Sequence, residues 1–310
     1  MTLTTMSTPP TPTTRSGPRS GRPSRRGPRT TVMAVPALLW YAVFMIGPIG
    51  AIFVISVLRW PGMLAEIDFA GLDNYRAVLG DGLFWQAARN SAVQLVIAVP
   101  IMIVGAFMLG YFISTKPRGY RVLKVIIFTP ALISASAKAM IFWGMFAPQG
   151  VINKLLGSVG LEALQHAWIA DTATAFGCII AIDIWGGIGY TATLYAARLD
   201  ALPASVHEAA ELDGAGHWRR MWGIAYPMVR DYVGVTVMLQ FLWTLFTSAQ
   251  NVLLLTQGGP GNSSTNLSFL VYQKAFVQSD LGYSQAAGVL LFAIGLVGML
   301  TIRRAFRQPY

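Results

Sequence analysis

Long apolar stretches alternate with short polar connections along most of this chain, and their lengths are the first guide to its structure. Each stretch is close to the roughly 20 residues that an α-helix needs to cross the hydrocarbon core of a bilayer. The six stretches are Val32–Leu58, Ser91–Ser114, Val122–Ala147, Thr172–Leu199, Tyr232–Leu255 and Ala286–Ile302. The pattern predicts an all-α, polytopic membrane protein with six transmembrane helices.

Composition agrees with this prediction and sets one segment apart. Hydrophobic residues make up 54% of the 310 residues and charged residues only 12%, about half of what a soluble domain carries. Residues 1–31 contain no acidic residue and are rich in Thr, Pro, Ser, Gly and Arg, which predicts a disordered basic tail ahead of a transmembrane domain over 32–310. The tail also lacks aromatic residues, so we expect attraction to anionic lipid and no nucleic-acid partner.

The placement of basic residues predicts the orientation in the membrane. Most of the 23 Lys and Arg lie in the tail, in the connection around 116–124, in the loop 200–230 and after residue 302. Cytoplasmic segments of membrane proteins are enriched in Lys and Arg. We therefore expect both termini and the loop 200–230 on the cytoplasmic side, as an even number of spans requires.

The sequence offers little material for catalysis or for binding a metal or a cofactor. Cys178 is the only cysteine, which predicts a small apolar core residue. The histidines His166, His207 and His217 are scattered, and the phosphate-loop pattern G-x-x-x-x-G-K-[ST] is absent. We expect no catalytic residues, no metal site and no ATP hydrolysis by this chain itself.

The loop 200–230 is the most informative polar segment. Ser205 and Glu208 stand at capping-box spacing, which predicts a helix from Val206. Gly214 and Gly216 are expected to end that helix, since glycine accepts the left-handed conformation of a helix C-terminus. A second helical stretch, His217–Ala225, would end at Pro227 because proline is excluded from helix interiors.

The same loop has the features of a docking surface. Ala209 and Ala210 would leave one helix face smooth enough for another protein to approach closely, while Arg219 offers fixed charge beside it. We predict that docking involves Glu208, Ala209, Ala210, Asp213, Gly214 and Arg219.

Two ionisable residues lie inside predicted spans, where charge is costly unless it is paired or faces water. Lys138 in the third span and Asp183 in the fourth span fall at similar depth, roughly 5 Å to the outer side of the centre. Either they neutralise each other or they line a wet cavity, and both can hold. We expect them to interact.

A polar and aromatic stripe marks the fifth span. Trp243, Phe246, Thr247 and Gln250 recur at i, i+3, i+4 and i+7, so they share one helical face, and Asn251 is adjacent. Flat aromatic surfaces beside hydrogen-bonding groups suit a sugar. The stripe is either a sugar pathway or a helix-packing seam.

Several segments resemble one family in their order and in their side of the membrane. They are the loop 205–227, Gly71–Tyr75, Phe84–Asn90, Leu194–Pro203, Leu255–Pro260, Tyr272–Phe276 and Leu281–Tyr283. From about residue 32 to 306 the chain resembles the permease subunits of binding-protein-dependent ABC importers, in the carbohydrate branch of the maltose and glycerol-phosphate type. It departs from the family pattern at Tyr226, Asp231 and Gln250, the last of which leaves ligand identity open.

The resemblance implies an import cycle in the bacterial cytoplasmic membrane. An extracytoplasmic solute-binding protein would deliver a sugar to a pathway between this subunit and a second, homologous permease. Two ATPase subunits, which bind ATP and Mg, would dock on Glu208–Gly214 and carry out hydrolysis. The chain itself is then a transport component and no enzyme.

Two alternatives remain open at the level of sequence. The same importer class could carry glycerol phosphodiesters or another polar solute, with Lys138 as the contact for a phosphate. An ion-coupled secondary transporter could use Lys138 and Asp183 for coupling and would need no ATPase.

Overall fold

The computed structural model describes residues 28–62 and 65–307, so most of the predicted tail 1–31 lies outside the described residues. The residues that the structure describes divide into two units, with the boundary between Ile49 and Gly50. Within the described ranges the structure is almost wholly helical. Its strands are the short antiparallel pair β1 (Leu58–Arg59) and β2 (Asp68–Phe69), with Leu58 opposite Phe69.

The first predicted span is a helical run that contains one wide turn. It comprises α1 (Pro28–Tyr41), the π-helical turn η1 (Ala42–Ile46) and α2 (Gly47–Ile55). Its apolar part, Ala34–Ile55, is long and apolar enough to cross a bilayer. Helix α1 already begins at Pro28, because proline is well tolerated in the first turn of a helix.

The six-span prediction agrees with the helices of the described residues. Four runs are individually long and apolar enough to cross a bilayer, and two bent pairs raise the number to six if each pair is one span. The four runs are Ala34–Ile55, α4 (Gly82–Ser114), α8 (Ala175–Asp200) and α14 (Leu281–Ala305). The predicted all-α membrane fold is confirmed.

Helix α4 starts earlier than the predicted second span. Asp81 is its N-cap, and the Asp81 carboxylate accepts a 2.8 Å hydrogen bond from the Leu83 backbone N–H. Side-chain capping of this kind satisfies one of the first N–H groups of a helix. Gln86, Arg89 and Asn90 interrupt the apolar residues of the first turns before Ser91, which is why hydropathy placed the boundary too late.

Two of the predicted spans are broken helices. The third divides into α5 (Tyr120–Leu132) and a segment Ala135–Ser158 bent from it by 100°, which contains α6 (Ala135–Phe146) and α7 (Val151–Ser158). Ser134 starts α6 by accepting a hydrogen bond from the Ala137 N–H at 3.3 Å.

The fifth predicted span bends at a serine. Helix α11 (Tyr226–Thr247) ends before Ser248, and α12 (Ala249–Leu255) continues at an angle of 43°. The Ser248 side chain is hydrogen-bonded to residues of two other helices, so partners outside the span fix the position of the bend.

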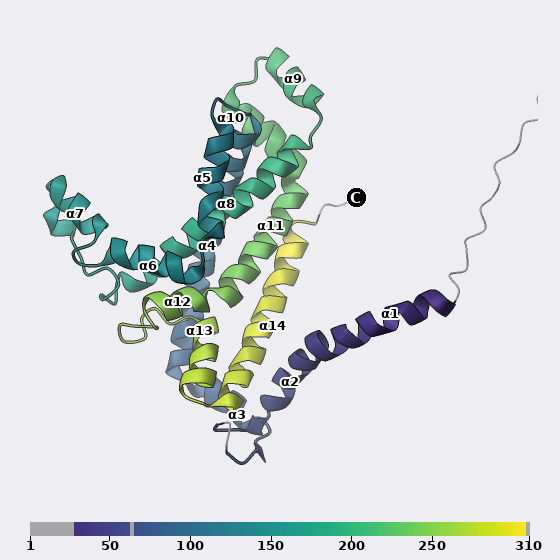
Figure 1. The fold of residues 1–310 in the computed structure, drawn as a ribbon, viewed down its shortest axis with the longest axis vertical. Coiled ribbons are helices and arrows are strands. Elements are labelled where there is room, and N and C mark those ends of the chain that lie inside the picture. Colours follow the sequence, from purple (N-terminus) through teal and green to yellow (C-terminus); the bar gives the residue numbers. More distant parts are fainter. Residues whose placement is uncertain (1–27, 63–64, 308–310) are drawn as a thin grey trace, which may run out of the picture. The chain divides into compact units, whose positions relative to one another are not determined.

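The helices of the second unit pack side by side around close contacts at glycine. Helices α4, α5, α8, α11 and α14 run alongside one another in Figure 1. A methyl group at Gly110 of α4 would lie 2.6 Å from Tyr195 Cβ of α8, and one at Gly189 would overlap the carbonyl oxygen of Ile127 in α5. Gly189 thus allows α8 to pack closely against α5.

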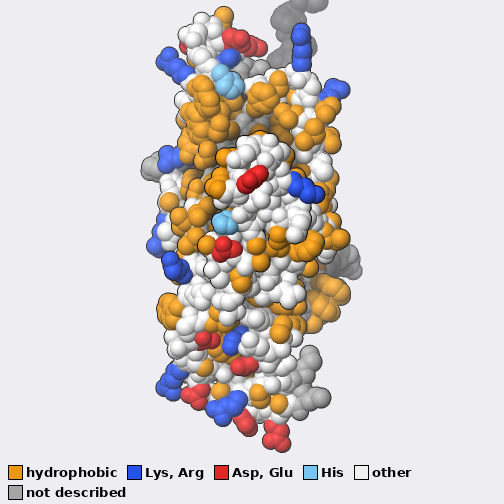
Figure 2. Space-filling model, turned by 90° about the vertical axis from the view of Figure 1, so that its left-hand side faces the viewer, with side chains coloured by type: hydrophobic (Ala, Val, Ile, Leu, Met, Phe, Trp, Pro, Cys, Tyr) orange, Lys and Arg blue, Asp and Glu red, His pale blue; other side chains and the backbone are white. Residues whose placement is uncertain are grey.

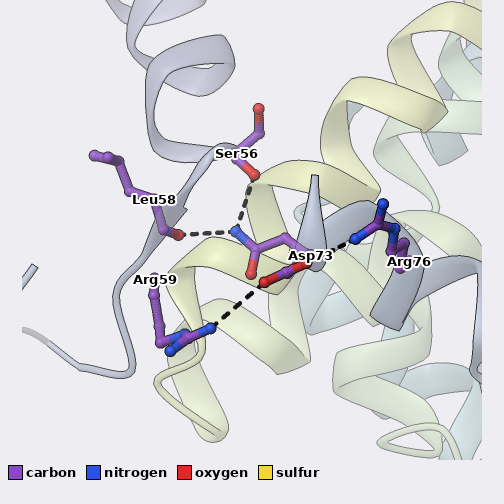
Figure 3. Close-up of polar contacts among 6 residues, drawn as sticks. Ser56, Leu58, Arg59, Asp73 and Arg76 are labelled. Carbon is purple, nitrogen blue, oxygen red and sulfur yellow. Dashed lines mark hydrogen bonds and ion pairs between the residues drawn. The ribbon is translucent and has the colours of Figure 1, made fainter. Parts of the chain in front are cut away.

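An asparagine on α3 (Asp73–Gly80) holds the connection that follows α2. Asn74 Nδ2 donates hydrogen bonds to the carbonyl oxygens of Ser56 at 2.9 Å and Leu58 at 2.8 Å (Figure 3). The neighbouring Asp73 pairs with Arg59 at 3.6 Å and with Arg76 at 3.1 Å. The segment Gly71–Tyr75, which carries part of the family resemblance, therefore organises this end of the structure.

The remaining elements of the second unit are short. Helices α9 and α10 lie at one end, and α3 and α13 lie toward the other (Figure 1). On the face shown in Figure 2, apolar side chains cover much of the flank, and charged side chains gather toward the lower end. The short elements are η2 (Glu162–Leu164), α9 (Ala204–Leu212), α10 (His217–Arg219), η3 (Arg220–Ala225), α13 (Leu267–Tyr272) and η4 (Gln273–Val277).

Candidate functional site

Helices α5, α6, α8, α11 and α12 surround a cavity of about 500 Å³, hereafter the central cavity. Its wall combines apolar, aromatic and polar side chains, which is the usual make-up of a site for a small organic ligand. The lining residues are Ala131, Lys138, Ile182, Asp183, Gly186, Gly187, Tyr190, Thr191, Leu194, Thr236, Leu239, Gln240, Trp243 and Asn251.

Asp183 is buried at the wall of this cavity and is held by three neutral side chains. Its Oδ2 accepts hydrogen bonds from Gln94 Nε2 and, at 2.8 Å, from Ser248 Oγ, while its Oδ1 accepts one from Asn251 Nδ2. A buried carboxylate is costly unless it is hydrogen-bonded. The three donors come from α4, α12 and the bend before it, so Asp183 ties three parts of the chain together.

The network continues beyond Asp183 into the start of α13. Asn266 Nδ2 donates to Gln94 Oε1 at 3.2 Å, and Asn266 Oδ1 accepts from the Phe269 N–H at 2.9 Å as the N-cap of α13. Sequence reasoning missed Gln94, Ser248 and Asn266. Polar residues inside apolar spans were the available signal, and only their partners distinguish them from ordinary helix contacts.

Lys138 lines the same cavity but does not neutralise Asp183 directly. Among the described residues the ion pairs do not include one between Lys138 and Asp183. The ammonium group lies instead over Gly186, where a methyl group would be 3.2 Å from Lys138 Nζ. Neutral donors already occupy most of the carboxylate, and the two residues share the cavity without an ion pair among the described residues.

The stripe of the fifth span is divided by the bend at Ser248. Trp243 lies on the cavity wall, and Asn251 reaches it from the other side of the bend. Phe246 packs against α14, since a methyl group at Gly295 would lie 2.7 Å from its ring. Thr247 and Gln250 are not among the residues that line the cavity. Of the four stripe residues, Trp243 is the one that lines the cavity, and the break at Ser248 separates Gln250 from the other three.

Gln240 extends the cavity face by one turn and was not predicted. Its Nε2 donates to Thr191 Oγ1 and, at 3.4 Å, to the Gly187 carbonyl, so the amide joins α11 to α8. Thr236, one turn further, bonds to the Tyr195 hydroxyl. Gln240 and Thr236 precede Trp243 at helical spacing, a periodic signal that could have revealed them.

The loop 200–230 ends its first helix as predicted. Gly214 has φ +68°, its N–H donates to the Glu211 carbonyl at 3.0 Å, and the Ala215 N–H donates to the Ala210 carbonyl at 3.0 Å. These two bonds form a Schellman motif, in which a left-handed glycine satisfies the last carbonyls of a helix.

The start of α9 and the role of Pro227 differ from expectation. The helix begins at Ala204 with Pro203 as N-cap and without a side-chain cap, so Ser205 does not close a capping box. Pro227 does not end the second stretch, because the helical run continues from His217 to Thr247. The π-helical turn η3 precedes Pro227 and places it in the first turn of α11, where its missing N–H is tolerated.

The exposed part of the loop differs slightly from the predicted surface. Glu208, Ala209, Asp213 and Arg219 are exposed, whereas Ala210 is buried under the Schellman motif. Glu211 pairs with Arg220 at 3.6 Å, which joins α9 to the start of η3. Of the two alanines predicted to form a smooth docking face, only Ala209 is therefore exposed.

Comparison with known sequences decides the family. The binding-protein-dependent transport system inner membrane component family matches residues 91–307. The chain belongs to this family. It is a permease component of a membrane transport system, as the resemblance implied, and the family assignment favours the importer over the ion-coupled transporter.

Individual relatives span nearly the same length. The permease is 31% identical to the probable ABC transporter permease protein YurN of Bacillus subtilis, with 88% of this chain and 94% of YurN covered. It is 31% identical to the lactose transport system permease LacF of Rhizobium radiobacter, covering 87% and 90%. It is 30% identical to the diacetylchitobiose uptake system permease NgcF of Streptomyces coelicolor, covering 90% and 84%.

A solved structure supports the fold. The permease is similar to a chain in the crystal structure of a bacterial ABC transporter involved in the import of the acidic polysaccharide alginate. The TM-score is 0.78 at 19% identity, with 90% of this chain and 95% of that chain covered. The predicted ABC importer permease fold is confirmed.

Proposed function

We propose that the permease forms part of the import pathway for a sugar or oligosaccharide delivered by an extracytoplasmic solute-binding protein. The central cavity carries this proposal. Trp243 offers a flat apolar surface, and Lys138, Gln240 and Asn251 offer hydrogen-bonding groups around the same space. Such a combination suits a ring with C–H faces and a rim of hydroxyl groups. The names of LacF and NgcF support a saccharide cargo.

The partners follow from the family and from the loop 200–230. We infer a second homologous permease subunit, with the pathway between the two, and two ATPase subunits that bind ATP and Mg. The exposed Glu208, Ala209 and Asp213 on α9, with Arg219 nearby, form the surface on which an ATPase docks. The Schellman motif at Gly214 fixes the direction in which the chain leaves that surface. Both termini and this loop face the cytoplasm.

The test is uptake by the reconstituted importer. The permease is co-expressed with a solute-binding protein, a second permease and an ATPase of its importer, and the complex is placed in proteoliposomes. We expect uptake of a radiolabelled saccharide that requires ATP and the binding protein and is blocked by vanadate. Uptake that persists without ATP, or transport confined to solutes that are not saccharides, contradicts the proposal.

A second cargo class has one observation in its favour. Lys138 presents an ammonium group to the central cavity without an ion-pair partner among the described residues, and a phosphate could bind there. Glycerol phosphodiesters are therefore included in the uptake assay.

A further inference from the structure

The central cavity contains one cation and one anion that face it from neighbouring helices. Lys138 projects from α6 and Asp183 from α8, and both line the space. Lys138 Nζ lies over Gly186, three residues after Asp183 on the same helix. Residues three apart on a helix are neighbours on its surface. The two charges are thus close to each other, although no ion pair joins them among the described residues.

Both groups have hydrogen-bonding capacity left. The carboxylate oxygens of aspartate accept about four hydrogen bonds in total. Asp183 Oδ2 accepts two, from Gln94 and Ser248, whereas Oδ1 accepts one, from Asn251. An ammonium group has three donors, and the hydrogen bonds within the described part of the chain use none of those of Lys138. One acceptor site and several donors therefore remain.

A hydroxyl group matches this arrangement better than an ion does. A hydroxyl accepts one hydrogen bond and donates another, so it can bridge Lys138 Nζ and Asp183 Oδ1. A ligand carboxylate or phosphate would satisfy Lys138 but would face the Asp183 carboxylate. A ligand ammonium would satisfy Asp183 but would face the Lys138 ammonium group. Like charges brought together in a partly dry site are strongly disfavoured.

We propose that Lys138 and Asp183 together bind one hydroxyl of an uncharged saccharide and make the cavity selective against charged sugars. The proposal rests on the proposed function and narrows it to neutral saccharides. Lys138 is the specificity-determining donor. Asp183 accepts from the hydroxyl while its other bonds hold the cavity wall. Trp243 supplies an apolar surface on the same wall.

The experiment measures how well isosteric sugars of different charge protect the cavity. Leu239, which lines the cavity, is replaced by cysteine in a Cys178→Ala background, and the complete importer is reconstituted with its other subunits freed of cysteine. The rate of labelling by a small polar thiol reagent is measured with cellobiose, cellobiouronic acid or chitosan disaccharide. These probes share one ring framework and are neutral, anionic and cationic. No binding protein is added, so its own selectivity does not enter.

We expect cellobiose to protect the cysteine at concentrations about ten-fold lower than either charged disaccharide. Lys138→Met should weaken protection by cellobiose about ten-fold, as expected for loss of a charged hydrogen bond. The same variant should improve protection by the cationic sugar relative to protection by the neutral one. Lys138→Gln, which keeps a donor, should retain part of the protection by cellobiose. Lys154→Met is the matched control, because Lys154 is exposed on α7 away from the cavity lining, and it should change nothing.

Three results would overturn the proposal. They are equal protection by all three sugars, strongest protection by the uronic acid, and protection by none. Each leaves the proposed function standing if the proteoliposomes still take up a saccharide with the binding protein present. Loss of that uptake in the wild type would instead contradict the proposed function.

Discussion

Ser248 donates a 2.8 Å hydrogen bond to the carboxylate of Asp183, and Ser248 is also the residue at which α11 gives way to α12. The bend in one membrane-spanning segment is therefore tied to a buried charge in another. Gln94 reaches the same carboxylate from α4. A change at Asp183 should consequently affect helix geometry as well as the lining of the central cavity.

The first prediction concerns the stability of this network. Asp183→Ala leaves the donors of Gln94, Ser248 and Asn251 without their acceptor, and each buried unsatisfied donor costs about 1–3 kcal/mol. The variant should unfold at a clearly lower temperature in detergent. The buried Cys178 allows a thiol-reactive fluorophore to report unfolding of the purified chain.

Two comparison variants define that result. Asp200→Ala changes an exposed aspartate at the end of the same helix and should leave the transition in place. Lys138→Met removes a cation without an ion-pair partner among the described residues and should also have little effect. A loss for Lys138→Met equal to that of Asp183→Ala would show that the two charges stabilise each other after all.

The second prediction concerns the left-handed glycine of the loop 200–230. Gly214 and Gly216 both have open space where a Cβ would be added, but only Gly214 has positive φ. Gly214→Ala should therefore destabilise the end of α9 by about 1 kcal/mol and reduce ATP-driven uptake, whereas Gly216→Ala should not. Gly214→Pro should abolish uptake. The amount of each variant in the membrane is measured by immunoblot as a control. Equal uptake by the two alanine variants would contradict a role for the Schellman motif.

A third prediction addresses docking at α9. Glu208 is exposed on this helix, so Glu208→Lys reverses a charge on the proposed ATPase surface without removing a buried contact. Uptake should be lost while the permease remains in the membrane, and co-purification of the ATPase should fall. Glu162→Lys, an equivalent reversal on the exposed η2 turn, is the control. Normal uptake by the Glu208→Lys variant would show that α9 is not the docking site.

Orientation provides the fourth prediction. The basic residues of the tail, the loop 200–230 and the C-terminal segment predict that these parts face the cytoplasm. A phosphatase reporter fused within 257–285 should be active, and one fused at the C-terminus should be inactive. The same signal from both fusions is incompatible with six spans in this orientation.

The fifth prediction distinguishes two residues of the fifth-span stripe. Trp243 lines the central cavity, whereas Phe246 packs against Gly295 of α14. In a Cys178→Ala background, Trp243→Cys should react with a small polar thiol reagent and change its rate between ATP-bound and nucleotide-free importer. Phe246→Cys should react slowly in both states. Equal rates for both cysteines would show that the stripe is one continuous wall of the pathway.

The glycine cap of α9 and the membrane-spanning segments could be predicted because each depends on residues close together in sequence. Apolar runs of sufficient length define spans whatever their neighbours are. Gly214 ends α9 because a left-handed position favours glycine locally. The start of α9 was missed for a related reason, since Ser205 had the spacing of a cap but the chain already becomes helical at Ala204.

The central cavity depended on contacts between distant segments. Gln94, Asp183 and Ser248 meet although long stretches of sequence separate them, and such pairings leave no periodic trace in any one span. Sequence alone thus determined an all-α membrane protein with a capped polar loop, through hydropathy and local backbone preference. Only the tertiary structure decided that Lys138 and Asp183 share a cavity without forming an ion pair. The physical reason is that neutral donors from other parts of the chain are hydrogen-bonded to the Asp183 carboxylate.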